Sequence, residues 1–206
     1  WFTATGTTSW SWNLPSLTIN GRYYVQTQVT DNGGNQTTSG ATAYYFIFDN
    51  TYPSGGSVTA PAAGVCLKSG PFTITWTSAT DPNLSSNVAL EYYDGTNWQT
   101  ITSSTPNDGS ESWNVPSGTF TSQIRITFTD CAGNTTQVTS SNFFVDNTAP
   151  TAGAVTLSHT CIIRGNTLTI NWGATSDNNT LPTNPIKLEY SNDGSNWYVI
   201  TAATDN

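Results

Sequence analysis

The chain has 206 residues, a net charge of −8 and only five Lys and Arg residues. Nucleic acids and anionic membrane surfaces are bound through basic patches, so this charge argues against both as partners. No apolar run approaches the roughly 20 residues of a membrane-spanning helix, so no membrane insertion is expected. Aromatic residues make up 12% of the chain, which indicates a folded rather than a disordered protein.

Three segments recur at a period of roughly one hundred residues, which is the size of a small domain rather than of a solenoid turn. The recurring pairs are residues 9–15 with 110–116, 49–53 with 146–150, and 66–76 with 161–172. A unit begins at Pro53 and the next at Pro150, where a proline after Asp-Asn suits a short stiff linker. The period therefore predicts a half domain in residues 1–52, a complete domain in 53–148 and another half domain in 149–206.

Residues 1–52 are expected to supply the last three strands of a β-sandwich. A glycine-containing hairpin loop is predicted at residues 31–35, between two of these strands. Val25, Val29, Phe46 and Phe48 would lie on a face that this half alone cannot cover.

Residues 53–148 alternate apolar and polar side chains with a period of two, which is typical of half-buried strands. An Asp-Gly hairpin turn is expected at Asp94–Gly95 and a longer loop at residues 130–134. Seven short strands are predicted, at about 57–60, 72–78, 88–93, 98–103, 111–115, 123–129 and 137–145. Seven strands in about one hundred residues favour an immunoglobulin-like (Greek-key) sandwich.

Residues 149–206 are expected to repeat the first four of these strands, with an Asp-Gly turn at Asp193–Gly194. Leu168, Ile170, Trp172 and Leu188 would then form a second uncovered apolar face. The predicted fold class is all-β, with tandem immunoglobulin-like (Ig-like) sandwiches, one complete and two half.

The sequence of the complete unit resembles the tandem Ig-like repeats of large microbial surface proteins. The resemblance rests on Trp113-Asn114-Val115-Pro116, on Ala132-Gly133-Asn134 after Asp130, and on Phe144 to Pro150. It implies an extracellular or cell-surface structural protein of the stalk, adhesin or filament type. The first unit departs mildly from the pattern at Gly33 and Tyr52.

Two hypotheses explain why the repeat begins and ends in mid-unit. The half domains are completed either by flanking repeats of a longer chain or by copies of the same chain arranged head to tail. The second arrangement does not close on itself and generates a filament. Both predict a line of Ig-like domains, so the predicted partners are copies of this chain or its own flanking repeats.

No catalytic constellation is evident, because the sequence lacks nucleophile-elbow, metalloprotease and phosphate-loop motifs and has one histidine. We therefore expect no enzyme activity and no cofactor other than calcium. Asp31, Asp49, Asp130 and Asp146 recur at hairpin loops and unit ends, where oxygen ligands could hold calcium and stiffen a rod. The alternative is that these residues cap turns through their own backbones.

The three cysteines do not form a closed set of disulfides. Cys66 and Cys131 would lie at opposite ends of one sandwich, too far apart to bond. We therefore expect Cys161 of one copy to pair with Cys131 of the next, across a domain junction. Asn-x-Ser/Thr glycosylation sequons occur at Asn35, Asn83, Asn134 and Asn178.

Two further functions stay open at this point. An adhesive or glycan-binding module would need exposed aromatic residues, for which Trp1 and Trp10 are candidates because the second unit has no matching tryptophan. An accessory segment of a large secreted enzyme would need a catalytic domain elsewhere in the same gene.

Overall fold

The computed structural model describes residues 12–14, 16–40 and 44–205. Their regular structure consists of strands alone, and none of these residues lies in a helix that could cross a membrane. The strands are β1 (Gly21–Tyr24), β2 (Thr27–Thr30), β3 (Gln36–Ser39), β4 (Tyr45–Phe48), β5 (Ser54–Ala60), β6 (Cys66–Leu67), β7 (Gly70–Thr80), β8 (Leu84–Tyr93), β9 (Trp98–Pro106), β10 (Ser110–Val115), β11 (Thr119–Ser122), β12 (Ile124–Asp130), β13 (Thr135–Thr139), β14 (Phe143–Asp146), β15 (Val155–Leu157), β16 (Ile170–Trp172), β17 (Ile186–Tyr190) and β18 (Tyr198–Thr204).

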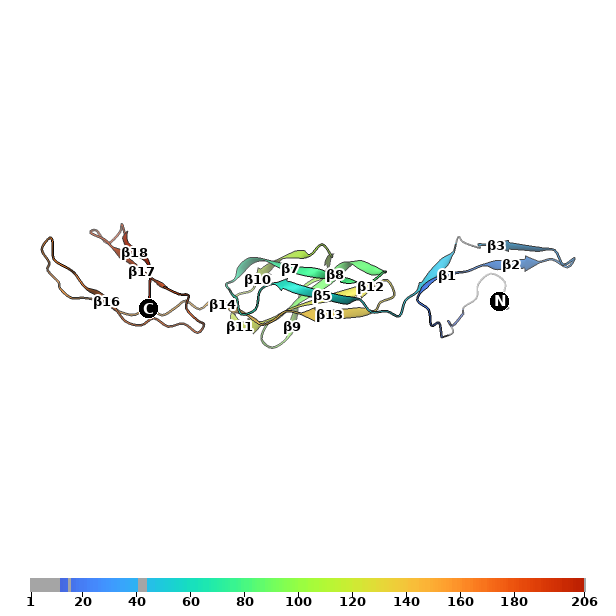
Figure 1. Ribbon diagram of the computed structural model, residues 1–206, viewed down its shortest axis with the longest axis horizontal. Helices are drawn as coiled ribbons and strands as arrows, with labels where there is room; N and C mark the ends of the chain where they lie inside the picture. The colour runs from blue at the N-terminus through green and yellow to red at the C-terminus, as the bar shows by residue number, and fades with distance from the viewer. Residues whose placement is uncertain (1–11, 15, 41–43, 206) are drawn as a thin grey trace.

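The central strands, β5 to β14, form a two-layer sandwich (Figure 1). One layer has the strand order β10-β7-β5 and the other has β13-β12-β8-β9, with all neighbours antiparallel. A small third sheet, in the order β11-β14-β6, closes one end. The predicted all-β, Ig-like architecture is confirmed.

The core of the sandwich follows the predicted alternation of side chains. In β12, Ile124, Ile126 and Phe128 are fully buried, whereas Arg125 and Thr127 between them are only half-buried. The fully or nearly fully buried apolar residues are Ile74, Trp76, Ala79, Val88, Leu90, Trp113, Val115, Ile124, Ile126, Phe128, Phe143 and Val145. All of them come from the central sandwich.

The last predicted strand of the complete domain, residues 137–145, is divided in two. β13 pairs with β12, whereas β14 pairs antiparallel with β11 and parallel with β6. Ser140 lies buried at the break, where its Oγ accepts a hydrogen bond from the Ile124 N–H (2.9 Å) and donates one to the Ser141 carbonyl (2.8 Å). The change from one sheet to another thus coincides with a buried, hydrogen-bonded serine.

The N-terminal segment pairs its strands in the same registers as the end of the complete domain. β2 and β3 place Val29 opposite Thr37, as β12 and β13 place Phe128 opposite Thr136. β1 and β4 likewise repeat the pairing of β11 with β14. The backbone of this segment is therefore that of the last strands of an Ig-like domain.

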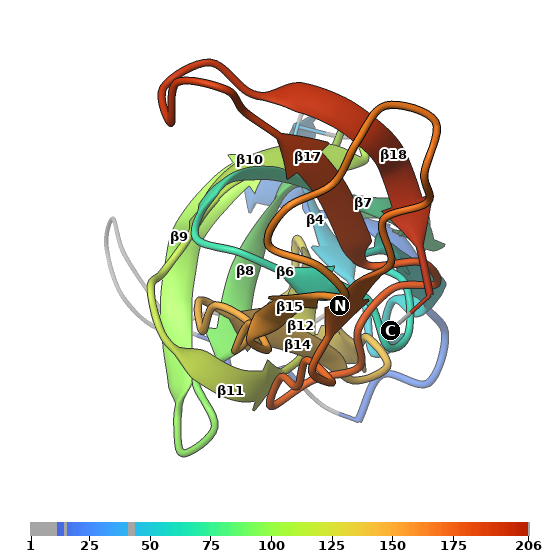
Figure 2. The same ribbon diagram turned by 90° about the vertical axis from the view of Figure 1, so that its left-hand side faces the viewer.

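The C-terminal segment repeats the first half of the complete domain in the same way. β15 and β16 place Val155 opposite Trp172, as β5 and β7 place Val58 opposite Trp76. β17 and β18 repeat the pairing of β8 with β9. The two end segments lie on opposite sides of the sandwich along the long axis of the molecule (Figure 1), and Figure 2 looks along that axis from the C-terminal side.

Candidate functional site

Three aspartates meet where the N-terminal segment joins the complete domain. Asp49 directly follows β4, Asp81 directly follows β7, and Asp130 ends β12. One carboxylate oxygen of each lies within 4.8 Å of the others. Asp49 and Asp130 are buried, with 9% and 4% of their surface exposed, and Asp81 is half-buried. Residues far apart in sequence thus form one compact acidic cluster, the Asp49–Asp81–Asp130 cluster.

Asp49 forms hydrogen bonds with both the N-terminal segment and the complete domain. Its Oδ1 accepts a hydrogen bond from the Thr51 N–H (3.0 Å), and its Oδ2 accepts one from Asn83 Nδ2 (2.7 Å). These two bonds, the Thr51 N–H first, hold the pKa of the Asp49 carboxyl below its ordinary value. Asn20 of the N-terminal segment also donates to Asp49 Oδ1 (3.3 Å), so the carboxylate is contacted from both sides of the junction.

Asp130 is held by its own hairpin loop. Its Oδ1 accepts hydrogen bonds from the N–H groups of Ala132 (2.8 Å) and Asn134 (2.9 Å). The Asn134 amide donates to Asp130 Oδ2 (2.7 Å) and also lies 3.2 Å from the carbonyl oxygen of Asp49. The loop therefore orients the carboxylate and docks on the linker at the same time.

Asp81 is the least satisfied of the three carboxylates. Its Oδ1 accepts a hydrogen bond from the Asn83 N–H (2.7 Å), but its Oδ2 is buried and has no hydrogen-bond partner. A buried polar atom without a partner costs roughly 1–3 kcal/mol. Because both oxygens belong to one carboxyl group, the unpaired oxygen lies at the same cluster.

No cationic side chain balances this cluster within the described part of the chain. The ion pairs found there join Arg125 to Glu91 and Lys187 to Glu189. Close carboxylates without a cation repel one another, and the low polarity of a partly buried site strengthens that repulsion.

The same hydrogen-bond pattern recurs at the second junction. Asp146 directly precedes the linker to the C-terminal segment, and its Oδ2 accepts hydrogen bonds from the Asn179 and Asn178 amides. The Asn179 N–H donates to Asp177 Oδ1 (3.1 Å), as the Asn83 N–H does to Asp81. The Asn179 amide, followed by the Thr148 N–H, holds the pKa of Asp146 below its ordinary value.

Asp31 occupies the position of Asp130 in the N-terminal segment. Its Oδ1 accepts hydrogen bonds from the N–H groups of Gly33 and Asn35, and its Oδ2 accepts one from the Asn35 amide. The Asn35 side chain is the main cause of its lowered pKa. Each of the four aspartates singled out in the sequence therefore caps its own turn, and two of them, Asp49 and Asp130, also meet in the cluster.

The structure adds Asp81 and Asp177, which sequence reasoning missed. The available signal was the recurrence of an aspartate two residues before an asparagine, in Asp81-Pro82-Asn83 and Asp177-Asn178-Asn179. Nothing in that spacing resembles a metal-binding loop, so only the structure reveals that Asp81 lies beside Asp49 and that Asn179 links Asp177 to Asp146.

The predicted glycosylation sites divide into two kinds. The Asn83 and Asn134 amide nitrogens, which would carry the glycan, donate hydrogen bonds within the junction and belong to half-buried residues. Asn35 and Asn178 are exposed, although their amides also contact Asp31 and Asp146.

Cys66, Cys131 and Cys161 are free and exposed. Cys66 pairs with Phe144 near the second junction, whereas the Cys131 N–H donates to the Asn83 carbonyl at the first junction (3.0 Å). Trp1 and Trp10 lie outside the described residues.

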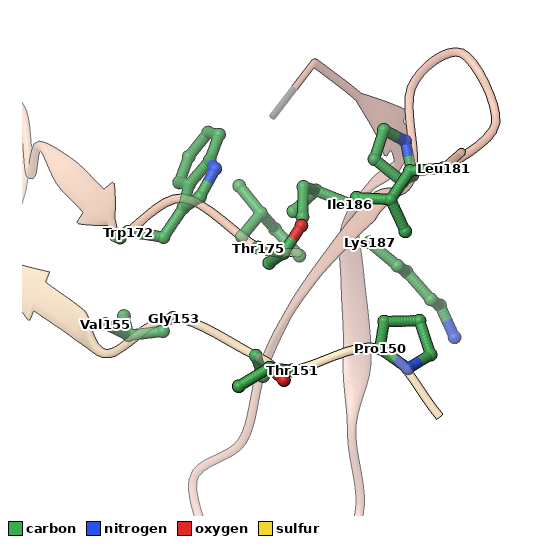
Figure 3. A pocket seen from close by; sticks show the side chains of 13 residues that line it. Pro150, Thr151, Gly153, Val155, Trp172, Thr175, Leu181, Ile186 and Lys187 are labelled. Atoms are coloured by element: carbon green, nitrogen blue, oxygen red, sulfur yellow. The ribbon is translucent and has the colours of Figure 1, made fainter. Parts of the chain in front are cut away.

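An open apolar groove of about 310 Å³ runs through the C-terminal segment. Figure 3 shows Val155 and Trp172 toward one end of this groove and Pro150, Leu181 and Lys187 toward the other. The groove is lined in part by Ile186 and Leu188 of β17, the strand that corresponds to β8 of the complete domain. In the complete domain, β8 is paired with β12, and β12 contributes three fully buried side chains to the core. The described part of the C-terminal segment, β15 to β18, has no counterpart of β12.

A family model matches the central part of the chain. Residues 60–147 match the family model described as a bacterial Ig-like domain. This match supports the Ig-like fold of the complete domain, and no curated protein matches the chain.

Two solved structures show partial similarity. The crystal structure of an engineered protein has a TM-score of 0.36 and 22% identity, covering 45% of this chain and 20% of its own. Fibronectin(III)-like modules of CbhA from Clostridium thermocellum have a TM-score of 0.35 and 15% identity, covering 44% of this chain and 94% of theirs.

Proposed function

We propose that the chain is a structural repeat unit of an extracellular fibre, stalk or filament, in which each end segment is half of an Ig-like sandwich. The halves are completed by neighbouring copies or by the rest of a longer chain. The resemblance of the central domain to bacterial Ig-like repeats supports the extracellular setting.

The distribution of apolar side chains carries this proposal. Among the described residues, every large apolar side chain that is exposed lies at or before Tyr52 or at or after Val155. Every apolar core residue lies between Ile74 and Val145. Exposed apolar faces of this kind mark surfaces that are covered by a partner.

The strands of the two end segments complement each other. The C-terminal segment holds counterparts of β5, β7, β8 and β9, and the N-terminal segment holds counterparts of β11 to β14. Placing β2 beside β17, as β12 lies beside β8, would bring Val29 to the position of Phe128. The composite would restore the strand that the open groove lacks.

The test is sedimentation and negative-stain imaging of the 206-residue chain over a range of concentrations. Ile200 corresponds to Ile101, which packs against the core, whereas its neighbour Val199 corresponds to the exposed Thr100. Ile200→Asp should therefore abolish assembly into threads, and the matched control Val199→Asp should leave it intact.

Concentration-dependent threads that respond in this way would support completion by neighbouring copies. A monomer whose two ends are cleaved by protease while the central domain survives would support completion by flanking repeats. A monomer whose ends resist protease as well as the centre does would contradict the proposal.

A further inference from the structure

We infer that the outer face of the β1–β4 ribbon binds a carboxylate-bearing sugar unit of an acidic glycan. This face is formed by Arg22, Tyr24, Tyr45 and Ile47, because Arg22 pairs with Ile47 and Tyr24 pairs with Tyr45 in the register of the two strands. The inference goes beyond the structural role proposed above, because it assigns a ligand to a surface that completion of the half domain would leave open.

The opposite, inner face of the ribbon has a different role. It carries Tyr23, Phe46 and Phe48, and the Tyr23 ring lies 5.4 Å from the Phe46 ring and 6.4 Å from the Phe48 ring. Phe46 and Phe48 occupy the positions of Phe143 and Val145, which are fully buried in the complete domain. A partner that completes this half of a sandwich would therefore cover the inner face.

The outer face would stay exposed in a completed domain. Tyr24 and Tyr45 are 53% and 51% exposed. Thr121 and Asn142 hold the positions of Arg22 and Tyr45 in the complete domain, and both are exposed there. An arginine and a tyrosine thus stand where the complete domain has smaller polar residues, so the packing of the sandwich does not account for them.

Arg22 is held in place without an ion partner. Its guanidinium carbon lies 4.2 Å from the centre of the Tyr45 ring, which is a cation–π contact. The ion pairs in the described part of the chain use Arg125 and Lys187 instead. The sequence outside that part contains no Asp or Glu, so it provides no carboxylate for Arg22 either.

Arg125 of the complete domain shows the same stacking with its charge satisfied. Its guanidinium carbon also lies 4.2 Å from a ring centre, that of Trp98, but Glu91 forms an ion pair with it at 2.7 Å. Arg22 thus presents a prepositioned guanidinium, and a guanidinium binds a carboxylate through two parallel hydrogen bonds. Because the chain as a whole carries a charge of −8, this arginine is a local site for one anionic group rather than part of a basic surface.

The tyrosines indicate that a sugar ring carries that carboxylate. The rings of Tyr24 and Tyr45 lie 6.2 Å apart and are inclined at 61°. Arg22 stacks on Tyr45, which leaves Tyr24 as the platform for the ligand. The face of an aromatic ring is electronegative and attracts the weakly positive C–H groups of a sugar. Tyr24 would therefore stack on the sugar while Arg22 binds its carboxylate.

The size and charge of the face argue against macromolecular alternatives. A specific protein interface buries about 800 Å² and roughly 20–30 residues on each partner, far more than one two-stranded ribbon offers. A nucleic acid is bound through several basic residues, whereas this face has one. A uronic or sialic acid unit, with one ring and one carboxylate, matches one free tyrosine and one unpaired arginine.

The test is a glycan array probed with the fluorescently labelled 206-residue chain. The salt concentration should be about 0.15 M, because charges more than about 8 Å apart are then largely screened. Calorimetry with the glycan that binds most strongly gives the affinity. We expect glycans that contain uronic or sialic acid to bind and neutral glycans of the same length not to bind.

Variants separate the roles of the side chains. Arg22→Gln and Tyr24→Ala should each weaken binding at least about tenfold, whereas Tyr24→Phe keeps the ring and should bind like the wild type. Arg125→Gln is the matched control, because it removes a stacked arginine whose charge is paired within the domain. Arg22→Gln should leave the unfolding midpoint unchanged in circular dichroism, since Arg22 is exposed.

The inference is overturned if no acidic glycan binds, if neutral glycans bind as tightly as acidic ones, or if Arg125→Gln weakens binding as much as Arg22→Gln. Equal competition by a hexaglutamate peptide would also overturn it, because the face would then recognise a carboxylate without a sugar ring. Assembly into threads is measured separately by sedimentation, so the outcome is independent of the proposed structural role.

Discussion

The complete domain and the two end segments share their strand pairing but differ in burial. Trp113, within β10, is 5% exposed, whereas Trp12, its counterpart in the N-terminal segment, is 40% exposed. Phe128 is fully buried, whereas Val29 at the matching position is 64% exposed. Local sequence is thus enough to set the register of a hairpin, but a core forms only where both halves of the sandwich are present.

Turn chemistry explains why the registers agree. Asp94 and Asp193 cap their hairpin turns with the same two backbone bonds, to the second and third residues that follow. Such bonds span a few residues and need no distant partner. Burial of a strand face depends on residues from the other sheet, which the end segments lack.

The largest expected effect comes from the two matched tryptophans. Trp113→Ala should lower the free energy of unfolding of the complete domain by about 3–5 kcal/mol, because Trp113 packs against Tyr92 and Phe143 in the core. Trp12→Ala should change it by less than about 0.5 kcal/mol. Urea unfolding followed by circular dichroism measures both.

An equal loss of unfolding free energy in the two tryptophan variants would contradict the difference between the two regions. It would mean that the N-terminal segment has a core of its own. In chains that have assembled into threads, Trp12→Ala should become destabilising. The same substitution thereby reports whether a neighbouring half has covered this face.

The second prediction concerns the number of calcium ions per chain. If the Asp49–Asp81–Asp130 cluster holds calcium, as the sequence allows, the isolated chain should bind one ion there, because within the described residues no third carboxylate joins Asp146 and Asp177. In a composite domain, the Asp31 of another copy would take the position of Asp130, so assembled chains should bind two ions per chain. Each bound ion stabilises the folded state, by about 2.7 kcal/mol when free calcium is at one hundred times the Kd of the site.

Asp177→Asn should remove the second ion and leave the first, and Asp81→Asn should do the reverse. This extension rests on the proposed composite domain. A stoichiometry that stays at one in assembled threads would contradict the composite domain while leaving the first site intact. Weaker calcium binding by monomeric Asp177→Asn would contradict both assignments.

The sequence predicts the fold well because its main signals are local. The alternation of Ile124, Ile126 and Phe128 places them on one face of a strand, and the structure confirms it. The division of the last strand at Ser140 was missed, because it involves a hydrogen bond to Ile124, sixteen residues away in sequence.

The candidate site was only partly predictable for the same reason. Asp49 and Asp130 stand out because they recur at unit ends and hairpin loops. Asp81 carries no such signal, since it lies in an ordinary loop after β7 and reaches the other two only when the sheets pack. A site assembled from three separate loops is invisible to spacing rules.

The third prediction tests which ends of neighbouring domains face each other. Cys66 lies at the Asp146 end of the complete domain and Cys131 at the Asp49 end. In a line of domains, Cys161, the counterpart of Cys66, would face the Cys131 of the next copy. We expect mild oxidation of assembled threads to yield a Cys131–Cys161 disulfide between copies, detected by mass spectrometry of non-reduced peptides.

The matched control for the disulfide is Cys66→Ser, which should leave the cross-link unchanged, whereas Cys161→Ser should abolish it. A bond between Cys66 and Cys131, or thiols that all stay free, would contradict this arrangement of copies.

The smallest expected effect compares two hairpin turns that are alike in sequence. Asn97 and Asn196 donate their N–H groups to Asp94 and Asp193, which is the main reason that the pKa of each carboxyl lies below its ordinary value. Both pKa values should be low when measured by carboxyl NMR titration, although only Asp94 belongs to a domain with a core. An ordinary pKa for Asp193 beside a lowered one for Asp94 would show that the turn depends on the rest of the fold.

The sign of the pH effect follows from the direction of these shifts. A carboxyl whose pKa is lower in the folded state stabilises that state above its unfolded pKa, about 3.9 for aspartate. This stabilisation is lost as the pH falls through the folded-state pKa. As the pH falls from about 4 toward the lower folded-state pKa, the Asp193 turn should therefore open progressively and alone, seen as faster amide exchange at Ser195 and Asn196. The Asp94 turn should stay protected until the complete domain unfolds, because the strands on both sides of it are held by the core.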